Sequence, residues 1–273
     1  MRRALPALLV NALLVLGALA TATPLLWMLS ASFMPTGQAN ELPPRLLPSP
    51  PTLEHYAVLF TRLDLARHLG NSLMIAIGST LICVAVCGMA GYAFARLEFK
   101  GRERVFQTLV AGMLIPAQVG MLPLFLLLKA MGLVNTMAGV MIPMMAPIFG
   151  IFMVRQYALG IPRDLLDAAR MDGASESRIF WTIVVPLLRP ILATLAIFAF
   201  LTSWNDFLWP LIVLSDDARY TLPVALANLS GEHVQDTELM MAGAVLTVAP
   251  VLLVFLLLQR HYVRGLLMGG VKG

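Results

Sequence analysis

Long runs of apolar residues, separated by shorter polar stretches, dominate this sequence of 273 residues. A helix needs about 20 predominantly apolar residues to cross a bilayer, and six runs are long enough. They predict an all-α, polytopic membrane protein with six transmembrane helices, built as one transmembrane domain over residues 1–273. The predicted spans are about residues 7–31, 70–95, 105–128, 136–154, 184–208 and 239–259.

Composition supports the membrane class. Hydrophobic residues make up 59% of the chain, charged residues only 12%, and the mean hydropathy is +0.83. A soluble domain is typically about half apolar and a quarter charged. The sequence pI of about 9.4 is better explained by basic loops at the cytoplasmic membrane face than by nucleic-acid binding. We therefore expect membrane lipid, and no nucleic acid, as a partner.

The first run resembles a signal peptide at its start, because Arg2 and Arg3 precede it. It is too long for a signal sequence and continues through Met28, so we interpret it as a retained anchor. Residues 34–67 are rich in proline and predict an extended extracytoplasmic connection. A short amphipathic piece is expected within it, at 53–60.

The basic residues are distributed unevenly over the loops. If both termini are cytoplasmic, the inner segments carry 14 of the 19 Lys and Arg residues and the outer segments carry five. Short cytoplasmic loops are enriched in Lys and Arg, so this orientation is preferred over its opposite. The outer basic residues are Arg45, Arg62, Arg67, Lys129 and Arg219.

One polar stretch, residues 162–190, lies between strongly apolar runs on the predicted cytoplasmic side. It predicts two short helices. Pro162 suits a first helical position, and Arg170 lies near the end of that helix, where Gly173 can supply a left-handed stop. Ser175 can cap the second helix.

The spacing in this stretch resembles the EAA loop of ATP-binding cassette (ABC) importer permeases. The resemblance rests on Asp167-Ala168-Ala169, then Gly173, then Ile183-x-Val185-Pro186 after nine further residues. The family usually has Glu at the first position and Leu before the proline. Asp167 and Val185 are conservative departures from that pattern.

Two further stretches resemble the sugar-importing branch of these permeases, specifically the shorter, six-span, maltose-type second subunit of a permease pair. They are the Trp204–Pro210 stretch (WNDFLWP) and the tail at 265–273 (GLLMGGVKG). The resemblance then extends over nearly the whole chain.

The resemblance implies an importer assembled from several subunits in the bacterial cytoplasmic (inner) membrane. The partners would be a second permease subunit, two ATPase subunits that bind ATP and Mg²⁺, and an extracytoplasmic solute-binding protein. The residues that would couple this chain to an ATPase subunit are Asp167, Ala168, Ala169, Arg170, Asp172, Gly173 and Pro186.

No catalytic constellation is visible in the sequence. HExxH, GxSxG and GxxxxGK[ST] are all missing, so we expect neither an enzyme nor a cofactor bound by this chain. Cys83 and Cys87 lie one helical turn apart inside an apolar run, without His or carboxylates nearby. We assign them to packing and expect no metal site.

Asn205 and Asp206 are the most informative polar residues near a span. A carboxylate at membrane depth is costly and usually faces the bundle interior or a cavity. One interpretation is that these two residues line the substrate pathway or contact a binding protein at its mouth; Gln118 and Asn71 have similar, weaker claims. The alternative is that Asp206 caps a helix locally at the outer interface, within an aromatic belt.

A self-sufficient secondary transporter or channel is the alternative function. It would favour buried ionisable residues and an internal repeat, yet spans two, three, four and six contain no Asp, Glu or Lys well inside. The sequence leaves the solute open: a mono-, di- or oligosaccharide fits, and so does a glycerol phosphate.

The predicted orientation can be tested by cysteine labelling from outside the cell. Ser177→Cys lies in the cytoplasmic loop and should stay unlabelled by an impermeant maleimide, whereas Thr52→Cys should react. Strong external labelling at position 177 would contradict the orientation.

Overall fold

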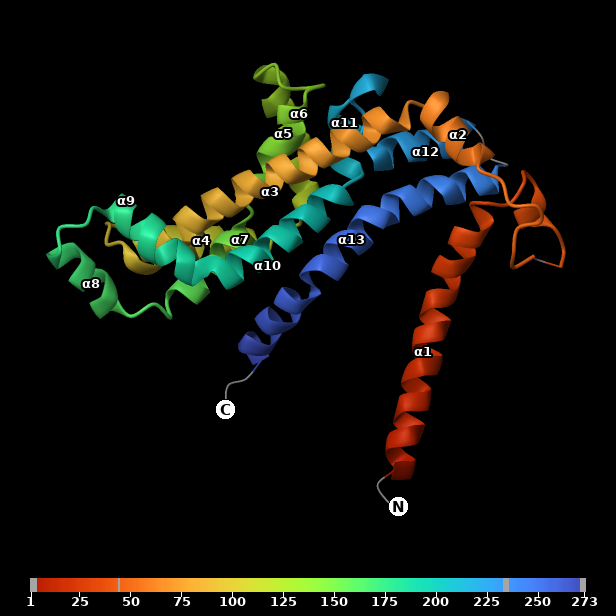
Figure 1. The fold of residues 1–273 in the computed structure, drawn as a ribbon. Helices are drawn as coiled ribbons and strands as arrows, with labels where there is room; N and C mark the ends of the chain where they lie inside the picture. Colours follow the sequence, from red (N-terminus) through yellow and green to blue (C-terminus); the bar gives the residue numbers. More distant parts are fainter. Residues whose placement is uncertain (1–3, 44, 233–235, 271–273) are drawn as a thin grey trace. The chain divides into compact units, whose positions relative to one another are not determined.

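The computed structural model describes residues 4–43, 45–232 and 236–270, and its regular elements in these ranges are all helical (Figure 1). The all-α prediction is confirmed. Arg2, Arg3 and the tail residues 271–273 lie outside the described ranges. The helices are α1 (Ala4–Ala31), α2 (Glu54–Thr61), α3 (Leu65–Arg96), α4 (Arg102–Gly112), α5 (Ala117–Ala130), α6 (Met137–Met141), α7 (Ile148–Ala158), α8 (Arg163–Met171), α9 (Glu176–Ile179), α10 (Val185–Trp204), α11 (Leu208–Val213), α12 (Leu222–Glu232) and α13 (Thr237–Gly270). Three short 3₁₀ helices are η1 (Gln38–Asn40), η2 (Ile142–Met144) and η4 (Asp217–Arg219), and one π turn is η3 (Phe180–Val184).

Within these ranges, four helical segments are long and apolar enough to cross a membrane unaided. Two bent helix pairs raise the number of candidate crossings to six when each pair is counted as one. The four continuous segments are Val10–Ala31, Leu65–Arg96, Glu176–Trp204 and Thr237–Leu256.

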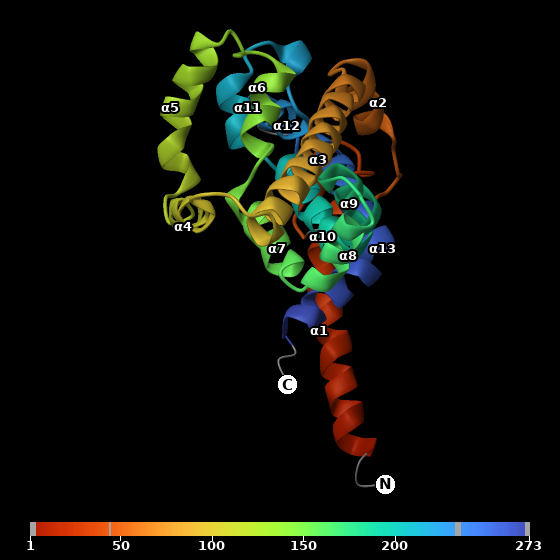
Figure 2. The same ribbon diagram turned by 90° about the vertical axis from the view of Figure 1, so that its left-hand side faces the viewer.

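The third apolar run is not one straight helix. Its two parts, α4 and α5, are bent by 105° at a short break, and Figure 2 shows α5 turning sharply away from α4. Pro116 stands at the break, directly before α5. Proline lacks a backbone N–H and disfavours a helical conformation in the residue before it. Pro116 therefore lies at a complete break of the helix, whereas Pro123 stays inside α5.

Other boundaries also differ from the apolar runs. The fourth run is a pair, α6–η2 and α7, bent by 41°. Helix α10 ends at Trp204 rather than near 208, and α13 continues beyond 259 to Gly270. The sequence did not predict α11, whose six residues directly extend the fifth apolar run, or α12.

The chain divides into two compact units, residues 1–66 with 225–252 and residues 67–224 with 253–273. In the second unit, α3, α7, α8, η3 and α10 share one buried core. Cys83 and Cys87 lie in this core as free thiols, in agreement with a packing role. The core's other buried residues are Tyr92, Ala95, Ile151, Val154, Ala158, Ile161, Leu166, Ile179, Phe180, Val184, Leu188 and Leu195.

In the first unit, the proline-rich connection is folded back on itself rather than simply extended. The buried Gln38 side chain donates to Ser49 O at 2.8 Å and accepts from Ser49 N–H at 3.0 Å. The amphipathic piece is helix α2, as predicted, and it buries His55, whose Nε2 lies 2.8 Å from Met34 O. These bonds replace the water contacts that an extended segment would keep.

Close packing of α3 on α7 depends on Gly91. A Cβ at this position would lie 2.6 Å from Val154 Cβ and 2.9 Å from the backbone nitrogen of Arg155. We predict that Gly91→Ala destabilises the protein by about 1–3 kcal/mol, the usual cost of overpacking. Gly70→Ala is the matched control in the same helix, because nothing lies within 4 Å of its Cβ position.

Thermal unfolding in detergent measures both variants. A lower midpoint is expected only for Gly91→Ala, since Ala otherwise favours a helix over Gly. Equal midpoints for the two variants would contradict the close approach of α3 and α7.

Candidate coupling loop and substrate pathway

The first helix of the polar loop is α8 (Arg163–Met171). Pro162 directly precedes this helix, with ψ 135°, so it is the N-cap and not the first helical residue that the sequence predicts. Asp164 in the first turn and Arg170 in the last turn both have the sign of charge that the helix dipole favours.

The turn after α8 is built on a glycine. Gly173 has φ +82°, the left-handed conformation expected of it. The N–H of Ala174 donates to Ala169 O, and the N–H of Gly173 donates to Arg170 O, both at 3.0 Å. These two bonds form a Schellman motif, with Asp172 as the C-cap. A residue with a Cβ would be strained at this left-handed position.

The second helix leads without interruption into a membrane span. Ser175 caps α9, because its Oγ accepts the N–H of Arg178 at 3.3 Å. After α9 the chain widens into the π turn η3 and then enters α10. Pro186 in the first turn of α10 has no N–H for the carbonyl of Thr182, and a π turn at this place accommodates the missing bond. Residues 176–204 thus form one helical rod.

The two faces of α8 differ. Leu166 is buried in the core, and Ala169, three residues later, packs against that core. Leu165 and Ala168 are exposed, and Met171 is 89% exposed. Ala169 therefore faces the core and not the exposed side of α8, because its three-residue spacing from Leu166 turns it inward.

Arg170 links the two helices through ion pairs. Its Nη1 lies 2.6 Å from Asp167 Oδ1, as the three-residue spacing predicts, and its Nε lies 2.7 Å from Glu176 Oε1. The hydrogen bonds that Arg170 donates to Glu176 and to Asp167 raise the pKa of its guanidinium above its usual value. Arg170 therefore stays charged at every physiological pH.

A cavity of about 540 Å³ lies beside this loop. Arg96, at the end of α3, forms one wall and donates to the carbonyl oxygens of Ala158 and Leu159, which holds the end of α7. The other lining residues are Leu97, Glu98, Arg163, Leu166, Asp167, Arg170 and Glu176. Three basic and three acidic residues line this cavity, so it suits a polar partner surface rather than an apolar ligand.

The residues proposed for the substrate pathway lie at the end of α10. Asn205 is the exposed C-cap of α10, and its Nδ2 donates to Leu201 O at 2.8 Å. The Oδ1 of Asp206 accepts the N–H of Trp209 at 3.4 Å, in the first turn of α11. Both side chains thus make local bonds, and the bond of Asp206 is of the kind that the capping alternative expects.

Gln118 lies apart in sequence, exposed in the first turn of α5. Within the described part of the chain, no hydrogen bond joins it to Asn205 or Asp206. Asn71 is buried, and its Nδ2 donates to Ala218 O and Tyr220 O at 3.0 Å each. That geometry gives Asn71 a structural role.

A family comparison identifies the chain. The sequence model of the family described as "Binding-protein-dependent transport system inner membrane component" matches residues 87–267, which include the polar loop and the stretch around Asp206. The chain belongs to this family. It is a multi-pass inner-membrane permease, not an enzyme, as the sequence predicts. The predicted ABC importer permease is confirmed in preference to a secondary transporter.

The permease is similar to relatives over nearly its whole length. It is 40% identical over 253 residues to the arabinooligosaccharides transport system permease protein AraQ of Halalkalibacterium halodurans, covering 92% of this chain and 91% of AraQ. It is 34% identical over 272 residues to the lactose transport system permease protein LacG of Rhizobium radiobacter, covering 100% of this chain and 98% of LacG.

A solved structure shares the fold of the permease. It is a chain of a bacterial ABC transporter involved in the import of the acidic polysaccharide alginate. The TM-score is 0.82 at 24% identity, over 95% of this chain and 98% of that one.

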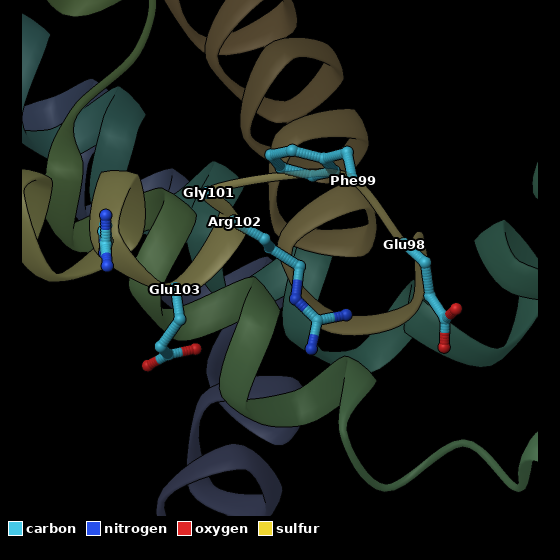
Figure 3. Close-up of a pocket in the computed structure, with 6 residues that line it drawn as sticks. Glu98, Phe99, Gly101, Arg102 and Glu103 are labelled. Atoms are coloured by element: carbon cyan, nitrogen blue, oxygen red, sulfur yellow. The ribbon is translucent and has the colours of Figure 1, made fainter.

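The turn between α3 and α4 of the permease is a second charged feature. Figure 3 shows Glu98 and Glu103 on either side of Arg102, in an open pocket of about 540 Å³. Arg102 Nη1 donates to Leu97 O at 2.9 Å, and Arg155 Nη2 lies 2.9 Å from Glu103 Oε2. These contacts fix the turn and leave no constellation for chemistry.

Sequence reasoning missed an intramembrane cavity of about 400 Å³. Its walls are mostly apolar, but Ser79 and Thr202 also line it. Ser79 Oγ is buried and has no hydrogen-bond partner. The signal in the sequence is slight, since Ser79 lies one helical turn before Cys83 inside an apolar run.

The two interpretations of Asp206 can be separated by paired substitutions. Asp206→Ala removes both the charge and the cap, and losing a cap costs about 1 kcal/mol. Asp206→Asn removes the charge but keeps an oxygen that can accept from Trp209. We predict that Asp206→Ala impairs uptake while the complex still assembles.

Uptake assays of the two assembled variants decide between the roles. Impaired uptake in both variants would mean that the charge of Asp206 is needed in the substrate pathway. Normal uptake in Asp206→Asn with impaired uptake in Asp206→Ala assigns Asp206 to capping, and normal uptake in both would contradict the prediction.

Proposed function

We propose that the permease forms, with a second permease subunit, the translocation pathway of an ABC importer for a sugar. It would be a single domain, residues 1–273, that crosses the membrane six times with both termini in the cytoplasm. An extracytoplasmic binding protein would deliver the solute, and two separate ATPase subunits would bind ATP and Mg²⁺. The geometry of α8, ending in the Schellman turn at Gly173, is the observation that carries the proposal.

The sugar class is supported by relatives of nearly equal length. AraQ and LacG are named for the transport of arabino-oligosaccharides and of lactose. An oligosaccharide or disaccharide is therefore the solute class we propose. Asn205, Asp206 and Gln118 are its candidate pathway residues.

Coupling to ATP hydrolysis would pass through α8. Leu165, Ala168 and Met171 leave an exposed apolar surface on this helix, and the small Ala168 permits close approach of a partner backbone. ATP-driven closure of the ATPase pair would move α8, and the continuous rod at 176–204 would carry that movement into the membrane. ATP and transport would then be linked through one two-state element. The other candidate coupling residues are Asp167, Ala169, Arg170, Asp172, Gly173 and Pro186.

Reconstituted complexes test this role of α8. Ala168→Trp adds bulk to the exposed face without disturbing the core, so it should abolish transport and weaken ATPase binding. Ala169→Trp is a poorer probe, because Ala169 packs inside the chain. Gly173→Leu should also lose transport, since it strains a residue at φ +82° by about 1–2 kcal/mol.

Gly173→Asn is the matched control, because Asn tolerates the left-handed conformation and no atom lies within 4 Å of the Cβ position. Co-purification of the second permease subunit verifies that each variant is folded. Wild-type transport and wild-type substrate-stimulated ATP hydrolysis in both Ala168→Trp and Gly173→Leu would mean that α8 is not the coupling element.

A further inference from the structure

Ion pairs join α8 to α9 across the turn between them. We call the three residues that form them, Arg170, Glu176 and Asp167, the clasp. The guanidinium of Arg170 donates through Nε to Glu176 Oε1 at 2.7 Å and through Nη2 to Glu176 Oε2 at 3.4 Å. Its Nη1 donates to Asp167 Oδ1 at 2.6 Å. The planar guanidinium group of Arg170 thereby holds the carboxylate in one orientation. A single ammonium group could not do this.

Glu176 also reaches a second membrane segment. The hydroxyl of Tyr92, on α3, donates to Glu176 Oε2 at 3.4 Å, which is long for such a bond. Tyr92 itself is only 3% exposed, and its ring centroid lies 5.6 Å from that of Phe180. Glu176 is thus the carboxylate at which α8, α9 and α3 meet, and Figures 1 and 2 both place the α8–α9 loop at the α4 end of α3.

The clasp is not required for folding. The side chain of Glu176 is 49% exposed, and exposed ion pairs contribute little to stability because solvent screens them. The buried Leu166, Ile179 and Phe180 hold the loop onto the core without this carboxylate. Apolar contacts are not directional, however, so they do not set the angle between the two helices as the clasp does.

We propose that Glu176 is a positioning residue for transport, whose carboxylate fixes α8 relative to α9 and α3. This inference rests on the proposed function. With the clasp closed, movement of α8 passes to the rod at 176–204 and to α3 together. With the clasp open, α8 pivots at the turn around Gly173, and ATP is hydrolysed without moving the spans.

Glu176→Ala, reconstituted with the second permease, the ATPase and the binding protein, tests the proposal. The complex should assemble and hydrolyse ATP, but the sugar transported per ATP should fall by about fivefold or more, the lower range of coupling between sites. Arg170→Lys should show the same defect, because it keeps the charge and loses the fork.

Glu98→Ala is the matched control. Glu98 lines the same cavity and carries the same charge, and the described structure shows no ion pair for it. A ratio of sugar to ATP in Glu176→Ala equal to that of wild type would overturn the proposal, as would an equal loss in Glu98→Ala. A wild-type complex that does not transport would instead refute the proposed function.

A covalent bridge separates positioning from direct contact with the ATPase. Arg170→Cys/Glu176→Cys, in a chain whose Cys83 and Cys87 are replaced by Ala, should be uncoupled when reduced. Joining the two thiols with a short bis-maleimide should restore the sugar transported per ATP. Assembled complexes that stay uncoupled after cross-linking would overturn the positioning role.

Discussion

The hydrocarbon interior of a bilayer offers no hydrogen bonds to a backbone amide, so a chain that crosses it must satisfy its own N–H and C=O groups. This constraint makes every apolar run of the permease helical and makes each proline consequential. Pro24, Pro190 and Pro250 are accommodated inside α1, α10 and α13. Pro116 instead lies at a break between two helices, and the N–H groups of the three residues before it make i→i−3 bonds.

The helical fold was largely predictable because the length of an apolar run is a property of local sequence. The breaks were not. Pro116 and Pro123 each lack a backbone N–H, and the packing around each proline decides whether the helix bends or stops. Helix α11 was not predicted from the sequence for a similar reason. Its residues continue the fifth apolar run, while the junction at Asn205 and Asp206 depends on caps that become recognisable only in three dimensions.

The polar loop at residues 162–190 shows the same division between local and distant contacts. The left-handed Gly173 and the Ser175 cap both depend on neighbouring residues, and each was predicted correctly. The inward turn of Ala169 was not, because it depends on which side of α8 meets the core through Leu166. The contact of Tyr92 with Glu176 joins residues 84 positions apart, a separation that no helical period predicts.

These contacts determine where the loop can bend. From Glu176 to Trp204 the chain is a continuous helical rod, in which the π turn η3 absorbs the missing N–H of Pro186. Helix α8 joins that rod through residues 172–175, which include a glycine at φ +82°. Two Schellman bonds hold the backbone of this turn, but glycine resists a change of dihedral angle less than other residues do. The direction of α8 therefore depends on the side chains that bridge the turn, and Arg170 with Glu176 is the bridge with fixed geometry.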